Sequence, residues 1–176
     1  AEGAWERLLE DFKGGRLQPR YAGDRSAPLH DYRVERSIFR GKRYAPVELV
    51  QYGRGCRFAC DFCSIHSFYG TSVRVRPIDG LLREIEPLPA KRLLFFVDDN
   101  LFSNEADLGD LLDAMRGLRR RWSCQISIDV ARDQRLLDRL AEAGCRFTLI
   151  GFESLLPANL RQMAKRWNKV AGSYQD

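Results

Sequence analysis

From residue 46 onward, short apolar runs alternate with segments that have the apolar spacing of a helix. The run at 92–97 is apolar throughout, which is typical of a strand buried on both faces of a parallel sheet. We expect further strands at 47–52, 124–130 and 147–152, and helices at about 77–86, 104–121, 133–143 and 157–167. Strands and helices alternating at these lengths require right-handed crossover connections. The sequence therefore predicts an α/β fold with a parallel sheet.

The first 45 residues have a different character. Trp5, Leu8, Leu9 and Phe12 share one face of a helix expected at 4–13, which a pair of glycines ends. Residues 16–45 are rich in Arg, Pro, Gly and Asp without a sustained period, which indicates a linker. We therefore divide the chain into an N-terminal helix and linker, 1–45, and a core, 46–176.

Composition excludes some classes of protein. The chain has 176 residues, 44% hydrophobic and 30% charged, enough for one domain with a core. No stretch approaches the ~18 consecutive apolar residues of a membrane span. The net charge is +5, but the basic residues are scattered, and the densest run, 119–121, falls near a predicted helix end. This pattern favours a solvated face over a nucleic-acid surface.

The chain does not begin with Met or with a basic and then apolar leader. Four strand–helix units also do not close a barrel. We therefore expect a piece of a longer protein.

Three cysteines, Cys56, Cys60 and Cys63, form the pattern C-x3-C-x2-C directly after the first predicted strand. Three thiolates in one tight loop can hold three corners of an iron–sulfur cube, which leaves the fourth iron open for a substrate, whereas electron-transfer clusters take four cysteines. A zinc site completed by His66 is the alternative, although its spacing fits no common zinc module. The clustered thiols fit a reducing cytoplasm.

Polar residues also follow the other predicted strands. Because the carboxyl ends of parallel strands meet at one edge, we expect these residues to lie together: Asp98, Asp99 and Asn100, then Ser127 and Asp129, then Glu153 and Ser154. A purely structural role is the alternative for two of these groups. The acids at 98–99 could serve turn and cap chemistry, and Asp129 could pair with Arg132 or Arg135. Trp122 and Trp167 are expected to cover the outer shell of the barrel.

The run GRGCRFACDFC at 53–63 resembles the signature of the radical S-adenosylmethionine (SAM) superfamily. The stretches CDFCSIHSFYG and VRVRPI, FFVDDN at 95–100, ISIDVARD at 126–133 and IGFES at 150–154 narrow the resemblance to the group with a cobalamin-binding domain, which includes methyltransferases and an anaerobic cyclase. The match covers roughly residues 40 to 170. Arg57 stands where many relatives have Pro, a departure that affects the loop conformation and not the ligand set.

The resemblance implies a partial (β/α) TIM-like barrel of about six units, here truncated to about four. It implies a [4Fe–4S] cluster on Cys56, Cys60 and Cys63, and reductive cleavage of S-adenosyl-L-methionine to a 5′-deoxyadenosyl radical. The residues implied to contact SAM are Asp98, Asp99 and Asn100 at the amino group, Ser127, Asp129 and Glu153 at the ribose or carboxylate, and Phe62 at the adenine. An adenine-binding motif normally on the fifth strand is absent.

Residues 1–45 would then be the tail of a cobalamin-binding domain. The resemblance implies a cobalamin-associated methyltransferase or cyclase that acts on a small-molecule or lipid-like substrate in preference to a nucleic acid, with flavodoxin or ferredoxin as the electron donor. Two alternatives stay open. One is an RNA-modifying enzyme similar to the methylthiotransferases, and the other is a non-catalytic metal-binding module.

Overall fold

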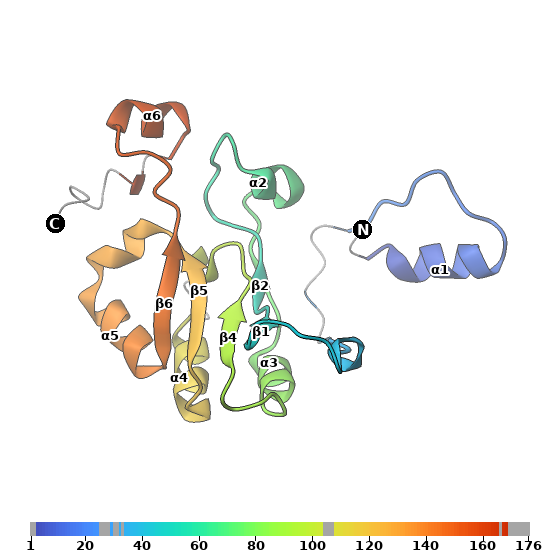
Figure 1. Ribbon diagram of the computed structural model, residues 1–176. Coiled ribbons are helices and arrows are strands. Elements are labelled where there is room, and N and C mark those ends of the chain that lie inside the picture. The colour runs from blue at the N-terminus through green and yellow to red at the C-terminus, as the bar shows by residue number, and fades with distance from the viewer. Residues whose placement is uncertain are drawn as a thin grey trace.

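The computed structural model describes residues 3–24, 29, 32, 34–103, 108–165 and 167–168. Its centre is a four-stranded sheet in the order β1-β4-β5-β6, and every pair of neighbours is parallel (Figure 1). The strands are β1 (Val47–Val50), β4 (Leu93–Phe96), β5 (Trp122–Ile126) and β6 (Cys145–Ile150). The predicted α/β fold with a parallel sheet is therefore confirmed.

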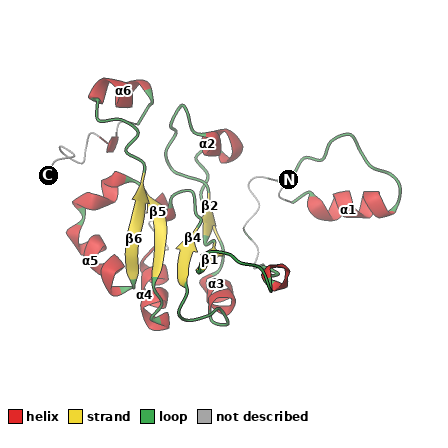
Figure 2. Ribbon diagram, in the orientation of Figure 1, coloured by secondary structure: helices red, strands yellow, loops and turns green. Residues whose placement is uncertain are grey.

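Three helices connect successive strands of this sheet, and Figure 2 shows them in red beside the yellow strands. They are α3 (Ile78–Ile85), α4 (Leu108–Leu118) and α5 (Gln134–Glu142). The start of α5 follows from Asp133, whose carboxylate accepts a hydrogen bond from the Leu136 backbone N–H at 3.1 Å. Its end follows from Gly144, which has a φ of 94°.

The hydrophobic core lies between these helices and one face of the sheet. Leu81 and Ile85 from α3 and Met115 from α4 are fully buried against Phe96 and Trp122 from the strands. The two aromatic rings meet edge to face with centroids 5.3 Å apart, a favourable arrangement. The indole N–H of Trp122 donates to the carbonyl of Ala143 at 2.8 Å, so its polar atom is satisfied.

The opposite face of the sheet is open in the part of the chain that the structure describes. Leu49, Phe147 and Leu149 on this face are each about half exposed. Strand alternation explains the difference, because neighbours along a strand point to opposite faces. Among the described residues, helices therefore cover one side of the sheet.

Two elements lie beyond the carboxyl ends of the strands, α2 (Ser64–Tyr69) and α6 (Pro157–Gln162) (Figure 1). A small antiparallel ribbon of β2 (Gly53–Arg54) and β3 (Arg74–Val75) lies at the base of α2. The sequence analysis did not predict this ribbon or α2. The remaining helix, α1 (Trp5–Lys13), matches its prediction and is drawn apart from the sheet in Figure 1.

Three predicted elements differ from the observed ones by more than two residues at one end at least, and the others agree within two residues. The strand expected at 124–130 ends at Ile126, and a 3-10 helix, η3 (Ile128–Arg132), follows it. The helix expected at 157–167 ends at Gln162. The helix expected at 104–121 is observed as Leu108–Leu118, and residues 104–107 lie outside the described residues. Two further 3-10 turns are η1 (Ser37–Phe39) and η2 (Leu101–Ser103).

Candidate active site

A cavity of about 440 Å³ opens at the carboxyl edge of the sheet. It is bounded by residues 53–63, here called the cysteine loop, by the ends of β4, β5 and β6, and by the segment after α6. Of the residues predicted to form the site, those that line this cavity are Cys56, Cys60, Cys63, Phe62, Asp99, Asn100, Ser127 and Glu153. Asp98 and Asp129 do not line it. The edge where parallel strands present their carboxyl ends is thus where the predicted residues gather.

The cysteine loop contains a glycine, Gly55, that no other residue could replace. Gly55 has a φ of 97°, and a Cβ placed on it would lie 2.0 Å from the carbonyl oxygen of Ser72. Further on, the Cys63 N–H donates to the Cys60 carbonyl at 3.1 Å, and the Asp61 N–H donates to the Met163 carbonyl at 3.3 Å. The loop is therefore turned by its own backbone and tied to the chain after α6.

Asp98 is buried, with 2% of its surface exposed, beneath the chain that leaves β1. One carboxylate oxygen accepts the Tyr52 N–H at 3.1 Å, and the other accepts the Gly53 N–H. Burial raises the pKa of Asp98 to about 7, and the two N–H donors act in the opposite direction. The structure places this carboxylate under the backbone and away from the cavity, unlike the position that the sequence analysis expected.

Asp99 and Asn100 do reach the cavity, and both also hold the cysteine loop. The Asp99 carboxylate accepts the Gly55 N–H at 2.8 Å. The Asn100 amide donates to the Cys56 sulfur at 3.8 Å and to the Ser127 hydroxyl at 3.0 Å. These side chains therefore connect the ends of β4 and β5 to the loop that carries the thiols.

Asp129 belongs to η3, and its carboxylate pairs with Arg57 at 2.5 Å. The sequence analysis considered Arg132 or Arg135 as its partner, and the structure gives Arg57 instead. Arg57 is the residue that follows the first cysteine, where many relatives have Pro. An ion pair to η3 thus restrains the loop at the position where the fixed φ of a proline would act. The guanidinium also lies over the Phe58 ring, 4.9 Å from its centroid.

Glu153 reaches the cavity from the segment after β6, and its backbone has a φ of 61°, which is uncommon for a residue with a side chain. Its carboxylate pairs with the ammonium of Lys165 at 2.9 Å. The same ammonium donates to the Gly151 carbonyl at 2.6 Å and lies 5.9 Å from the centroid of the Phe62 ring. A buried cation and a partly exposed carboxylate therefore stand side by side in the cavity wall.

The sequence analysis missed two aromatic side chains and one charged side chain in the cavity wall: Phe58, Trp167 and Lys165. The Phe58 and Trp167 rings stack with centroids 4.0 Å apart and planes at 13°. Trp167 was expected on the outer shell, and that prediction is wrong because the chain turns back over the cysteine loop after α6. No pattern in the neighbouring sequence predicts that the chain turns back over the cysteine loop. Trp122, by contrast, packs between the sheet and its helices.

The three cysteines all line the cavity. Sulfurs that bind one zinc ion at about 2.3 Å lie within about 4 Å of one another, whereas the cysteines of a cubane bind separate irons. Among the described residues, no three His, Cys, Asp or Glu side chains converge closely enough to hold one ion. His66 is exposed on α2 and does not line the cavity. Burial raises the pKa of Cys60 to about 11, and Lys165 acts against that rise.

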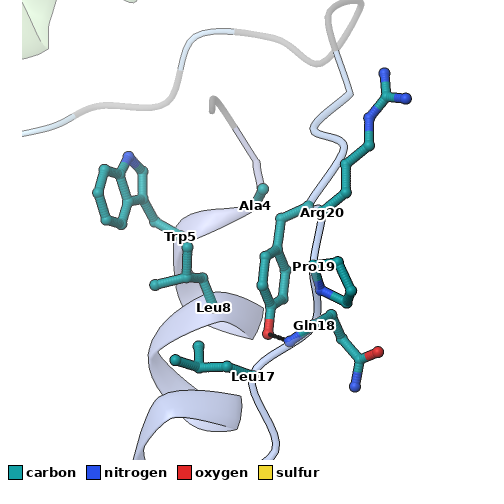
Figure 3. A pocket seen from close by; sticks show the side chains of 8 residues that line it. Ala4, Trp5, Leu8, Leu17, Gln18, Pro19 and Arg20 are labelled. Atoms are coloured by element: carbon teal, nitrogen blue, oxygen red, sulfur yellow. Dashed lines mark hydrogen bonds between the residues drawn. The ribbon is translucent and has the colours of Figure 1, made fainter.

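A second cavity, of about 360 Å³, lies between α1 and residues 17–21 (Figure 3). Trp5, Leu8 and Leu17 give it an apolar wall. The Tyr21 hydroxyl accepts the Gln18 N–H at 2.9 Å and donates to the Asp11 carboxylate at 2.9 Å. Among the described residues, no cysteine, histidine or carboxylate lines this cavity, and its polar contacts fold residues 17–21 back onto α1.

Comparison with known proteins agrees with this geometry. The family described as the radical SAM superfamily matches residues 50–174. The chain belongs to the radical SAM superfamily. The resemblance seen in the sequence motifs is confirmed, and the matched span includes the cysteine loop, all four strand ends and the segment after α6.

Two curated relatives of this radical SAM chain are methyltransferases. The bacteriochlorophyllide d C-12(1)-methyltransferase of Chlorobaculum tepidum is 30% identical over 179 residues, which cover 96% of the chain and 39% of that protein. The hopanoid C-2 methylase of Rhodopseudomonas palustris is 27% identical over 130 residues, which cover 69% of the chain and 25% of that protein. The chain thus spans between a quarter and two fifths of these relatives.

A solved structure shares the fold. The radical SAM methyltransferase TsrM from Kitasatospora setae, with tryptophan and a SAM analogue bound, superposes with a TM-score of 0.60 at 22% identity. The match covers 73% of the chain and 25% of TsrM. At this identity the likeness supports the fold, an open parallel sheet covered by helices on one side. In the described residues, no helix is both long and apolar enough to cross a bilayer.

Proposed function

We propose that this chain is the core of a methyltransferase that binds a [4Fe–4S] cluster through Cys56, Cys60 and Cys63 and cleaves S-adenosylmethionine reductively. One observation carries the proposal: three thiols from a single loop and polar side chains from the three following strand ends line the same cavity. Three cysteine ligands leave one iron for a substrate, as an open coordination position does in catalytic zinc sites.

The cavity wall supplies complementary groups for each part of SAM. Asp99 and Glu153 offer carboxylates to the ammonium and the ribose hydroxyls, and Lys165 offers a cation to the carboxylate of the methionine part. Phe62, which is about half exposed, offers a flat apolar surface for the adenine. Asn100 and Ser127 complete the polar wall between them.

Cys56, Cys60 and Cys63 would hold a reduced cluster, which would supply the one electron needed to break the C5′–S bond of SAM into methionine and a 5′-deoxyadenosyl radical. The residues of this chain have three tasks: to hold the thiols, to orient SAM and to keep the reacting atoms away from water. Asp98 and Asp129 take part only in the first task, because their carboxylates bind the cysteine loop and do not line the cavity.

We further propose that the methyl acceptor has a large apolar body and that cobalamin takes part in the transfer. The relatives named above act, by name, on bacteriochlorophyllide and on hopanoid. Support in this chain comes from Ile126, Leu149 and Ile150, which form an apolar part of the cavity wall next to the open sheet face. The assignment of residues 1–45 to the tail of a cobalamin-binding domain, a flavodoxin or ferredoxin donor, and a cytoplasmic location stay predictions.

Anaerobic reconstitution with iron and sulfide tests the cluster. We expect about four irons per chain and, with SAM and dithionite, release of 5′-deoxyadenosine. Cys60→Ala should abolish both, because one corner of the cube loses its ligand. Cys145→Ala is the matched control, since Cys145 lies on β6 away from the cavity, and it should retain both.

Two results would contradict the proposal. One is stoichiometric zinc in the chain purified without oxygen, which would indicate a mononuclear site. The other is full iron content or SAM cleavage in Cys60→Ala.

A further inference from the structure

The polar run after β4 forms a series of contacts with the chain that leads into the cysteine loop. Asp98 begins the series, because its two carboxylate oxygens accept the backbone N–H groups of Tyr52 and Gly53. Only 2% of its surface is exposed, so a bound molecule has no access to it. Both acceptor positions of this carboxylate that face the chain are already in use.

The series continues in register. Asp99, one residue on, accepts the N–H of Gly55 at 2.8 Å. Asn100, the next residue, donates to the sulfur of Cys56 at 3.8 Å. Each step along the run Asp98–Asn100 thus meets a later position of the segment 52–56.

Two further contacts extend the series to Arg57. The hydroxyl of Ser103 accepts the Arg57 N–H at 3.3 Å, and the Arg57 side chain pairs with Asp129. In total, five side chains that follow β4 and β5 contact five of the six residues 52–57. A set of contacts that follows the loop residue by residue fixes its path, whereas a set built for a ligand alone would point into the cavity.

We propose that the run Asp98–Asn100 is a template for the cysteine loop, holding its backbone and the Cys56 sulfur in position so that the thiols are arranged before any cofactor arrives. This inference rests on the proposed cluster site and adds positioning residues to it. Asp98 acts on the backbone alone. Asn100 acts on the sulfur, and its N–H···S hydrogen bond stabilises the more negative, reduced state of a bound cluster.

The first experiment measures iron per chain after anaerobic reconstitution of the full chain with ferrous iron and sulfide. At pH 8, where the Asp98 carboxyl is ionised, Asp98→Asn should lose most of the iron, because an amide offers one acceptor where two backbone donors need two. Asp99→Asn should retain it, because one acceptor suffices for the Gly55 N–H. Asp110→Asn, an exposed position on α4, is the control for the same chemical change and should match the original chain.

The same variants allow a measurement that needs no metal. In the iron-free chain, hydrogen exchange at the amides of Tyr52 and Gly53 should be at least tenfold faster in Asp98→Asn, while the amides of β5 keep their rates. Full iron content together with unchanged exchange would overturn the template. If the original chain itself takes up no iron, the proposed function fails, and the exchange result still decides the template.

A second variant covers the case in which Asp98→Asn does not fold, which faster exchange in β5 would reveal. Asn100→Leu keeps the size of the side chain and removes the donor. Its cluster should have a more negative reduction potential than that of the original chain, whereas Ser127→Ala, which removes the other partner of the amide, should leave the potential unchanged. Equal potentials in Asn100→Leu and the original chain, or an equal shift in Ser127→Ala, would overturn the role of Asn100.

Discussion

Asp98 is a buried acid on which two effects act in opposite directions. Burial raises its pKa from 3.8 to about 7, and the N–H groups of Tyr52 and Gly53 favour the ionised form without cancelling that rise. Between these two values the unfolded chain has already lost the proton that the folded chain keeps. The contribution of this proton to the stability of the folded chain is therefore fully present below pH 3.8, and it is lost as the pH rises through about 7.

This titration predicts how stability depends on pH. From pH 5 to pH 8, the free energy of unfolding of the iron-free chain should fall by about 3 kcal/mol more in the original chain than in Asp98→Asn, which cannot titrate. Urea unfolding at both pH values measures the difference, and the other groups cancel in it. Parallel pH profiles for the two proteins would show that Asp98 is ionised throughout.

Residues differ in how far the sequence could reveal their positions. The thiols and the acids at strand ends could be predicted, because spacing and the parallel sheet place them at one edge. The direction of each side chain could not. Asp98 turns under the backbone while Asp99, its neighbour, reaches the cavity, and only the packing of the loop decides between them. Lys165 was missed because nothing near it in the sequence marks its pairing with Glu153.

Among the elements, the segment after α6 forms one wall of the site. It crosses the cysteine loop, where Trp167 stacks on Phe58 and the Met163 carbonyl accepts the Asp61 N–H. Such a stacked aromatic pair adds about 0.5–1.5 kcal/mol beyond the burial of its surface. The segment thus covers part of the cysteine loop.

Removal of this ring should expose a bound cluster. We expect the cluster of Trp167→Ala to bleach several-fold faster in air than that of the original chain, because oxygen and water gain access to the cysteine loop. Loss of the brown absorbance over time measures the rate. Trp5→Ala, at an exposed tryptophan of α1, is the matched control. Identical decay in both variants would mean that Trp167 does not protect the site.

The elements that sequence patterns predicted are those with a clear apolar period. The four strands and the helices between them have one, whereas the ribbon of β2 and β3 has two residues in each strand and depends on Gly53 lying close to Arg74. The strand expected to reach residue 130 stops at Ile126, because the apolar residues Ile128 and Val130 are buried from a 3-10 turn and not from a strand. Residues 128 and 130 are buried in the 3-10 turn as they would be in a strand, so their apolar pattern does not distinguish the two structures.

At the scale of the whole molecule, the sheet has two unlike faces. One is packed against α3, α4 and α5, and the other leaves Leu49, Phe147 and Leu149 half exposed in the described part of the chain. Exposed apolar side chains that lie together favour association with another surface. The open face continues into the cavity at Leu149, which fits a substrate with an apolar body lying along it.

We expect replacement of a phenylalanine by alanine to have a large effect on stability on one face of the sheet and a small effect on the other. Phe96→Ala, on the covered face, should lower the free energy of unfolding by about 3–5 kcal/mol, because it leaves a cavity beneath the helices. Phe147→Ala, on the open face, should cost less than about 1 kcal/mol, because half of that ring already contacts water. Urea unfolding of both variants at one pH compares them directly. A similar large loss in both would mean that the open face is packed in solution, and the apolar wall would then be core rather than a surface for substrate.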